Sequence, residues 1–220
     1  MKTSWPYFVL LLASVGAWVQ EPAAGPAADD ALARLMAGNL RYVRHKEQHP
    51  DQSLARRKEL VGGQHPFAVI LSCADSRVPP ELLFDQGLGD LFVVRVAGNI
   101  ADDAVLGSIE YAVKHLGTKL VMVLGHEKCG AVSAAVEGGI TAAHTNALVA
   151  AIQSSIEGSA KEPGDRIHSC VIANARRVAK QIRESEPVLK DAVEKHRVKV
   201  VAADYALDSG KVNLLDGARR

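Results

Sequence analysis

Two short runs of apolar residues constrain the fold of this 220-residue chain most strongly. The run at 67–71 leads into Cys73, and the run at 120–124 leads into Gly125 and His126. Runs in which every residue is apolar, rather than every second one, are typical of parallel strands buried on both faces. Cys73 and His126 are therefore expected just past the carboxyl ends of buried strands, where open α/β sheets place their ligand crevices.

Strands and helices alternate along the rest of the chain. Strands are predicted at 67–72, 91–96, 119–124 and 198–205. Helices are predicted at 29–46, 52–61, 102–116, 128–137, 142–156, 166–184 and 187–196, with a short helix from Pro80 and a last strand pairing after the turn at 208–210. This order predicts an α/β fold in which a mostly parallel sheet is flanked by helices and preceded by an N-terminal helical arm.

Cys73, His126 and Cys129 are residue types that Zn²⁺ prefers as ligands. A closed structural zinc site usually has four such ligands. This group has three, so water or Asp75 can take the fourth position, as in a catalytic zinc site. His126 and Cys129 are three residues apart, and one helical turn is expected to aim both at one point. A redox dithiol is the alternative, but such pairs normally read Cys-x-x-Cys.

Asp75 and Arg77 follow the first cysteine closely. Asp75 can accept a hydrogen bond from a hydroxide nucleophile and so orient it, and Arg77 can hold Asp75 in a bidentate ion pair. If that pair breaks, Asp75 can bind the metal as a fourth ligand, and the sequence leaves both states open. An ordinary salt bridge is the alternative for the pair. Cys170, the third cysteine, is interpreted as a small buried apolar residue.

The first 28 residues are predicted to be a secretory signal peptide and spacer, separate from a single domain at 29–220. A basic start precedes an apolar core that extends to Val19, and small residues allow cleavage between Ala17 and Ala28. The mature chain is therefore expected in the periplasm or outside the cell, without stable membrane insertion; an uncleaved anchor is the alternative. The net charge of +1, from mixed acidic and basic residues, gives no sign of a nucleic-acid partner.

Several motifs in order give the chain a resemblance to the β-class carbonic anhydrases, over about residues 30 to 215. The matching stretches are 64–66, 73–79, 84–99, 110–113, 125–131, 174–177, 187–189 and 204–210. The resemblance implies the α/β fold of that family and one Zn²⁺ per chain, held by Cys73, His126 and Cys129. It also implies reversible hydration of CO₂ to bicarbonate and a proton through a zinc-bound hydroxide.

The resemblance further implies a homodimer or a tetramer, with the N-terminal helices embracing the partner and the active sites at the subunit interface. Gln64 would donate a hydrogen bond to a substrate oxygen. The pocket would be lined by Phe92, Ala97, Gly98 and Tyr111. The candidates for a proton shuttle are His65, His115 and His144.

One position separates the subtypes of the family. The branch with a non-catalytic bicarbonate site has Trp three residues before the first zinc cysteine, and this chain has Ile70 there. The resemblance is therefore to the plant-like subtype with an open zinc site. Two other functions stay open: a related zinc hydrolase of carbonyl sulfide or carbon disulfide, and an inactive homologue that binds zinc or bicarbonate.

Overall fold

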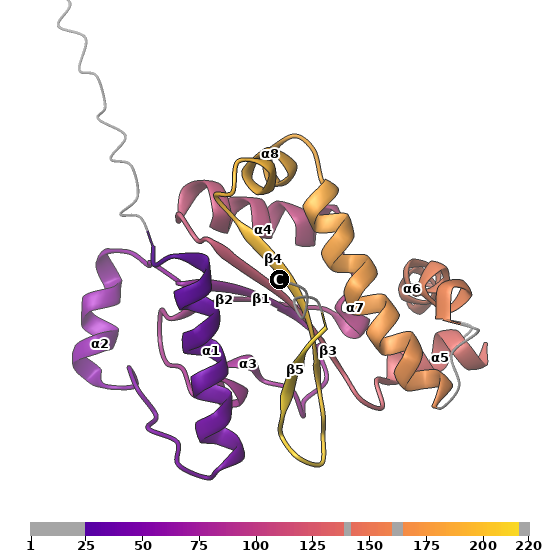
Figure 1. Ribbon diagram of the computed structural model, residues 1–220, viewed down its shortest axis with the longest axis horizontal. Coiled ribbons are helices and arrows are strands. Elements are labelled where there is room, and N and C mark those ends of the chain that lie inside the picture. Colours follow the sequence, from indigo (N-terminus) through magenta and orange to yellow (C-terminus); the bar gives the residue numbers. More distant parts are fainter. Residues whose placement is uncertain (1–24, 139–141, 160–164, 216–220) are drawn as a thin grey trace, which may run out of the picture.

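A five-stranded sheet forms the centre of the protein in a computed structural model that describes residues 25–138, 142–159 and 165–215 (Figure 1). The strands lie in the order β2-β1-β3-β4-β5. Their bounds are β1 Ala68–Ser72, β2 Leu91–Arg95, β3 Leu120–His126, β4 Lys199–Tyr205 and β5 Val212–Leu214. The first four are parallel and β5 pairs antiparallel to β4, so the predicted mostly parallel sheet and its last pairing are confirmed.

Helices surround this sheet in the predicted order. The helices are α1 Ala28–Val43, α2 Leu54–Glu59, α3 Pro80–Leu83, α4 Asp103–His115, α5 Gly130–Glu137, α6 Thr145–Ser159, α7 Arg166–Glu184 and α8 Val188–Glu194, with short 3₁₀ turns η1 Leu60–Gly62 and η2 Ala97–Asn99. Of the predicted signal peptide and spacer at 1–28, residues 1–24 lie outside the described residues, and α1 begins at Ala28. Within the described residues, no helix combines the length and the apolar character needed to cross a membrane.

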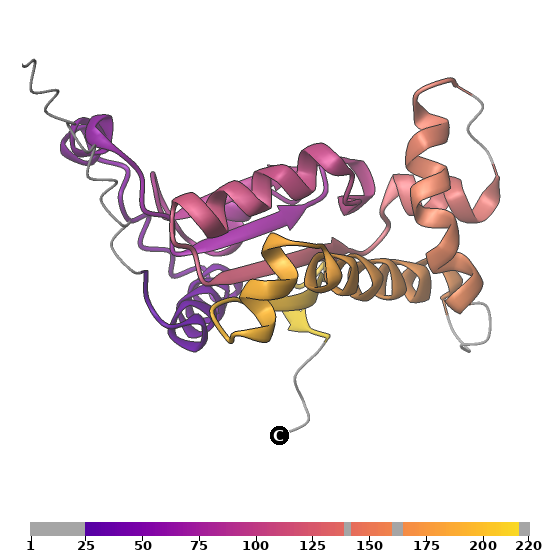
Figure 2. The ribbon, with the colours of Figure 1, turned by 90° about the horizontal axis from the view of Figure 1, so that it is seen from above.

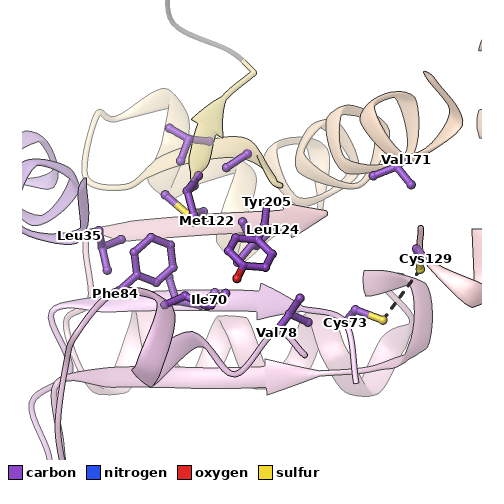
Figure 3. Close-up of a cluster of buried hydrophobic side chains, with 14 of the residues drawn as sticks. Leu35, Ile70, Cys73, Val78, Phe84, Met122, Leu124, Cys129, Val171 and Tyr205 are labelled. Atoms are coloured by element: carbon purple, nitrogen blue, oxygen red, sulfur yellow. Dashed lines mark hydrogen bonds between the residues drawn. The ribbon is translucent and has the colours of Figure 1, made fainter. Parts of the chain in front are cut away.

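The central strands β1 and β3 are buried on both faces, as their continuous apolar runs require. On one face, Ile70 and Met122 pack in a cluster with Leu35 of α1 and with Phe84, and Figure 3 shows these side chains together. The opposite face is covered by α4, α7 and α8. Its cluster includes the buried side chains Val69, Leu71, Val121, Val123, Ile109, Val178 and Leu189. Every residue of β1 and β3 is buried, which fixes the strand ends firmly.

The sheet has a topological switch point between β1 and β3. From β1 the chain crosses to β2 on one side, and from β2 it crosses to β3 on the other side of β1. A crevice opens where neighbouring connections leave a parallel sheet in opposite directions. The strands point toward the end of the molecule where α5 and α6 stand, and α2 stands at the far end (Figure 2).

Two predicted boundaries near the ligands were wrong. β3 continues through Gly125 to His126, because both residues pair with Asp204 and Tyr205 of β4. One helical turn does not join His126 to Cys129: Lys128 has a φ of 51°, and Cys129 is the N-cap of α5. The two ligands are brought together by a strand end, a tight turn and a helix start.

The predicted helix at 29–46 was also too long, since α1 ends at Val43. Asp85, which lies after α3, accepts hydrogen bonds from the backbone N–H groups of Gln48 and His49 at 3.0 and 2.9 Å. Arg41 donates to the same carboxylate. These contacts draw the segment after α1 away from a helical path.

Candidate metal centre and active site

The three predicted metal ligands come together at the carboxyl ends of β1 and β3. Cys73 follows β1 directly, His126 ends β3, and Cys129 precedes α5. Their ligand atoms all lie within 4.8 Å of one another, and the two sulfur atoms are 4.0 Å apart (Figure 3). At most 4% of the surface of each residue is exposed. The group is thus a compact, buried set of two sulfurs and one nitrogen.

The imidazole of His126 is oriented by the backbone. Its Nδ1 lies 2.8 Å from the carbonyl oxygen of Glu127, so Nδ1 donates and Nε2 is left as the atom with a free lone pair. Nε2 is buried and has no hydrogen-bond partner in the described structure. A buried polar atom without a partner is costly, whereas a metal ion would bind to that lone pair. The residues present therefore fit Zn²⁺.

The two thiols influence each other strongly. A hydrogen bond from Cys129 lowers the pKa of Cys73 to about 4, and the same contact raises the pKa of Cys129. The contact between the two sulfurs thus favours the thiolate at Cys73. Metal binding at two cysteines displaces the remaining proton, because the ligand is the thiolate.

Asp75 lies beside the ligand group but is turned toward Arg77. The guanidinium Nε and one terminal nitrogen of Arg77 donate to the two carboxylate oxygens at 2.9 and 2.7 Å, as predicted for a bidentate pair. The backbone N–H of Arg77 donates as well, at 2.9 Å. These contacts hold the pKa of Asp75 well below its usual range. Oδ2 of Asp75 is 3.9 Å from Nε2 of His126, so the carboxylate borders the position that a metal would take.

Two residues around Cys73 have contacts that the sequence interpretation did not include. Arg95, at the end of β2, donates from Nε to the carbonyl oxygen of Cys73 at 2.9 Å and from Nη2 to the carbonyl oxygen of Asp75. Gly98 donates its N–H to the sulfur of Cys73 at 3.3 Å. The arginine that closes the strand 91–95 could have been noticed, because it is a charged residue in an otherwise apolar run. Its partners could not be read from the sequence.

Two of the predicted substrate residues, Gln64 and Phe92, lie far from the three metal ligands of the same chain. Gln64 is exposed and precedes β1, whereas Cys73 follows that strand, so about 16 Å of strand separates them. Phe92 pairs with Val69, four residues before Cys73, which places it about 13 Å back along the sheet. Its ring centroid is 6.2 Å from that of Tyr111, so these two predicted residues do meet each other.

Some of the remaining predicted residues lie near the metal ligands, and others do not. Ala97 and Gly98 form η2, and Gly98 is in contact with the metal group through Cys73. The candidate proton shuttles His65, His115 and His144 are all exposed, and the ring of His115 packs on Tyr111 with centroids 5.4 Å apart. Within a single chain, the structure thus joins the metal group to Asp75, Arg77 and Gly98, and leaves Gln64, Phe92 and Tyr111 apart from it.

Comparisons with known proteins agree with this arrangement. Residues 68–212 match the sequence model of a family described as carbonic anhydrase. Carbonic anhydrase 2 of Mycobacterium tuberculosis is 39% identical over 186 residues, which cover 83% of this chain and 90% of the relative. This chain therefore belongs to the β-class carbonic anhydrase family, whose members are carbonate dehydratases.

Solved structures show the same fold. The crystal structures of two tetrameric β-carbonic anhydrases from Sordaria macrospora include a chain that matches with a TM-score of 0.69 at 22% identity, covering 86% of this chain and 98% of that one. A Coccomyxa β-carbonic anhydrase in complex with acetazolamide matches with a TM-score of 0.65 at 29% identity, covering 72% of this chain and 75% of that one.

Proposed function

We propose that this protein uses one Zn²⁺ per chain, held by Cys73, His126 and Cys129, to hydrate CO₂ reversibly to bicarbonate and a proton. The observation that carries the proposal is the buried, unpartnered Nε2 of His126 beside two thiols that are 4.0 Å apart. Zn²⁺ would act as a Lewis acid that makes hydroxide available from water near neutral pH.

Asp75 and Arg77 orient the nucleophile in this proposal. Because Arg77 donates to both carboxylate oxygens, Asp75 stays ionised and is held beside the ligand group. An ionised carboxylate can only accept hydrogen bonds, so it directs the proton of the nucleophile to itself and leaves an oxygen lone pair for the carbon of CO₂. Arg77 also donates to the carbonyl oxygen of Lys128 at 3.3 Å, which ties the pair to the turn that carries Cys129.

The substrate side is proposed to be completed by a second copy of the chain. Gln64 and Phe92 are too far back along the sheet to reach the metal group of their own chain, and Tyr111 packs against Phe92. Tyr111 is 48% exposed in the single chain. Large aromatic side chains are enriched where a protein surface is covered by a partner, so this exposure favours a partner subunit over Tyr111. In a homodimer, these residues of one subunit would line the pocket of the other.

The location of the protein is proposed from the sequence of the first 28 residues. A basic start, an apolar core and small residues favour export and cleavage between Ala17 and Ala28, which would place the enzyme in the periplasm or outside the cell. Mass spectrometry of the chain recovered from the exported fraction tests this, and an intact N-terminus in the cytoplasmic fraction would contradict it.

The test of the proposed function is stopped-flow CO₂ hydration by the purified mature chain from about pH 6.5 to 9, with the zinc content measured on the same sample. We expect rapid turnover near pH 7 that requires one zinc per chain. Because the similar Coccomyxa protein was solved with acetazolamide, inhibition by this compound is also expected. Bound zinc without turnover at any pH would contradict the proposal and direct the assay to carbonyl sulfide and carbon disulfide.

A further inference from the structure

Gly98 links the sulfur of Cys73 to a buried polar network that the proposed function does not use. Its N–H donates to Sγ of Cys73 at 3.3 Å, and its carbonyl oxygen accepts a hydrogen bond from Nδ2 of Asn174, in α7, at 2.8 Å. Both bonds join distant parts of the chain, and Asn174 is only 1% exposed. Water therefore does not compete for the contact between Asn174 and Gly98.

The backbone of Gly98 needs such an external support. Its φ of 72° is in the left-handed region, which glycine tolerates and other residues rarely adopt. A Cβ at this position would lie 2.7 Å from Cδ1 of Ile152, so the backbone also packs closely against α6. Since η2 is too short to fix the direction of this N–H by regular hydrogen bonding, the partner on the carbonyl oxygen helps to set it.

The amide of Asn174 is itself held in one orientation. Its Oδ1 accepts hydrogen bonds from the hydroxyl of Ser155 at 3.1 Å and from a terminal guanidinium nitrogen of Arg177 at 3.2 Å. Nε of Arg177 donates to the Ser155 oxygen at 2.7 Å, so the hydroxyl proton is free to point at Asn174. With two donors on its oxygen, the amide must turn its nitrogen to Gly98.

Arg177 anchors this network to α6. It donates to the carbonyl oxygen of Ala151 at 2.8 Å, and burial lowers its pKa. A cation that is half-buried among neutral acceptors is costly unless each donor has a partner. The network therefore has a defined geometry that runs from α6 through α7 to η2 and ends at the sulfur of Cys73.

We infer that Asn174 is a positioning residue for the metal centre, which acts through Gly98 on the sulfur of Cys73. The inference rests on the proposed function, because it concerns the thiolate as a zinc ligand. A hydrogen bond to a thiolate withdraws electron density from the sulfur and fixes its place, as outer contacts do at other metal sites. Ser155 and Arg177 serve this role by holding the Asn174 amide in its orientation.

Asn174→Asp is the sharpest variant. It keeps the shape of the side chain, and its charge lies beside Arg177, but it cannot donate to the carbonyl oxygen of Gly98. We would replace zinc by Co²⁺ and record the thiolate-to-cobalt charge-transfer band in the near ultraviolet. We expect the band to move to longer wavelength, because a sulfur that receives a weaker hydrogen bond holds its electrons less tightly. Competition with a chelator should show metal affinity reduced roughly tenfold.

Gln181→Ala is the matched control. Gln181 also lies on α7 and donates its amide to a nearby carbonyl oxygen, that of Ala101, at 2.8 Å. It meets the network through one long hydrogen bond, 3.4 Å from Arg177, and it makes no hydrogen bond to Asn174 or Gly98 in the described structure. We expect this variant to keep the wild-type cobalt band.

Ser155→Ala provides a second variant if Asn174→Asp fails to fold. It removes one of the two donors on Oδ1 of Asn174, so we expect a smaller shift in the same direction. A cobalt band at the wild-type wavelength in whichever of the two variants folds would overturn the inference and leave the proposed function standing. A wild-type protein with no thiolate-to-cobalt band would instead overturn the proposed metal centre.

Discussion

The proposed metal ligands and the proposed substrate residues of this enzyme lie in opposite kinds of surroundings. Cys73, His126 and Cys129 are at most 4% exposed, and each is fixed by a strand end or a helix start. Tyr111 is 48% exposed, and Gln64 lies in an exposed loop at the other end of β1. One chain thus brings all three proposed metal ligands together, whereas its proposed substrate residues lie apart from that group.

The difference has a physical reason. Thiolates and an imidazole that face one dication must be shielded from water and held within a fraction of an ångström, which buried strand ends at a switch point provide. A pocket for CO₂ needs only a few apolar walls and one polar contact, and two copies of a chain can share these between them. We therefore expect changes in the metal group to act within one chain, and changes at Gln64 to act on a partner.

Cys129→Ala should have the largest effect. Two remaining ligands are too few for a tetrahedral zinc site, so the metal should be lost and CO₂ hydration should fall to the uncatalysed rate. Zinc content and stopped-flow hydration on one sample measure this. Cys170→Ala is the control, because Cys170 is equally buried but lies in α7. The control should keep one zinc per chain; normal hydration in Cys129→Ala would refute the ligand set.

Asp75→Asn should retain zinc and lose hydration by about 10²- to 10³-fold, because the amide cannot serve as the anionic acceptor that orients the nucleophile. Arg77→Ala should act in the same direction, since it removes the bidentate contact. Zinc analysis and kcat are the measurements. An Asp75→Asn enzyme with wild-type kcat would remove the orienting role from this carboxylate.

A test of shared sites combines one impaired variant with one inactive variant. Gln64→Ala should bind zinc but lose about tenfold in hydration, and Cys129→Ala should bind none. When both chains are co-expressed with different tags, half of the dimers are mixed. Each mixed dimer has one site with an intact metal group and an intact Gln64 from the partner, so we expect about a quarter of the wild-type activity above background. Activity equal to the average of the separate variants would show that Gln64 acts within its own chain.

Asp85→Asn should give the smallest effect. It tests how firmly Asp85 holds the segment after α1 that contains Gln48 and His49. Burial works to raise the pKa of Asp85, but hydrogen bonds from Gln48 and Arg41 outweigh it, so the pKa is lowered. The carboxylate therefore stabilises the fold above the ordinary carboxyl pKa of about 4, and this stability is lost as the pH falls below it. The variant should lose about 1 to 3 kcal/mol at pH 7.

Thermal unfolding at pH 7 and pH 3.5 measures the effect at Asp85, and zinc content serves as the control. The difference in unfolding temperature between wild type and variant should be smaller at pH 3.5 than at pH 7. Both proteins should bind zinc equally. A variant as stable as the wild type at pH 7 would show that the carboxylate does not hold this segment.

The sequence predicts the strands and the ligands well because both depend on local patterns. The wholly apolar runs before Cys73 and His126 are typical of buried strands, and α7 was predicted with its observed bounds of 166 and 184. The end of β3 was placed two residues too early, because Gly125 interrupts the apolar pattern while its backbone still pairs with β4.

The contacts of Arg95, Gly98 and Asn174 could not be predicted, although all three lie in motifs that carry the family resemblance. Their roles depend on where a side chain or a left-handed backbone points across separations of up to 76 residues. Local patterns contain no information on such directions. The same holds for the distance between Gln64 and Cys73, which became evident only when β1 was placed between them.

The most direct test of the account is X-ray absorption at the zinc edge of the purified enzyme. We predict two sulfur ligands at about 2.3 Å and two nitrogen or oxygen ligands at about 2.0 to 2.1 Å. This result would match Cys73, Cys129 and His126 with one further position open to water. A zinc ion with no sulfur neighbour, or with four, would contradict the metal centre described for this chain.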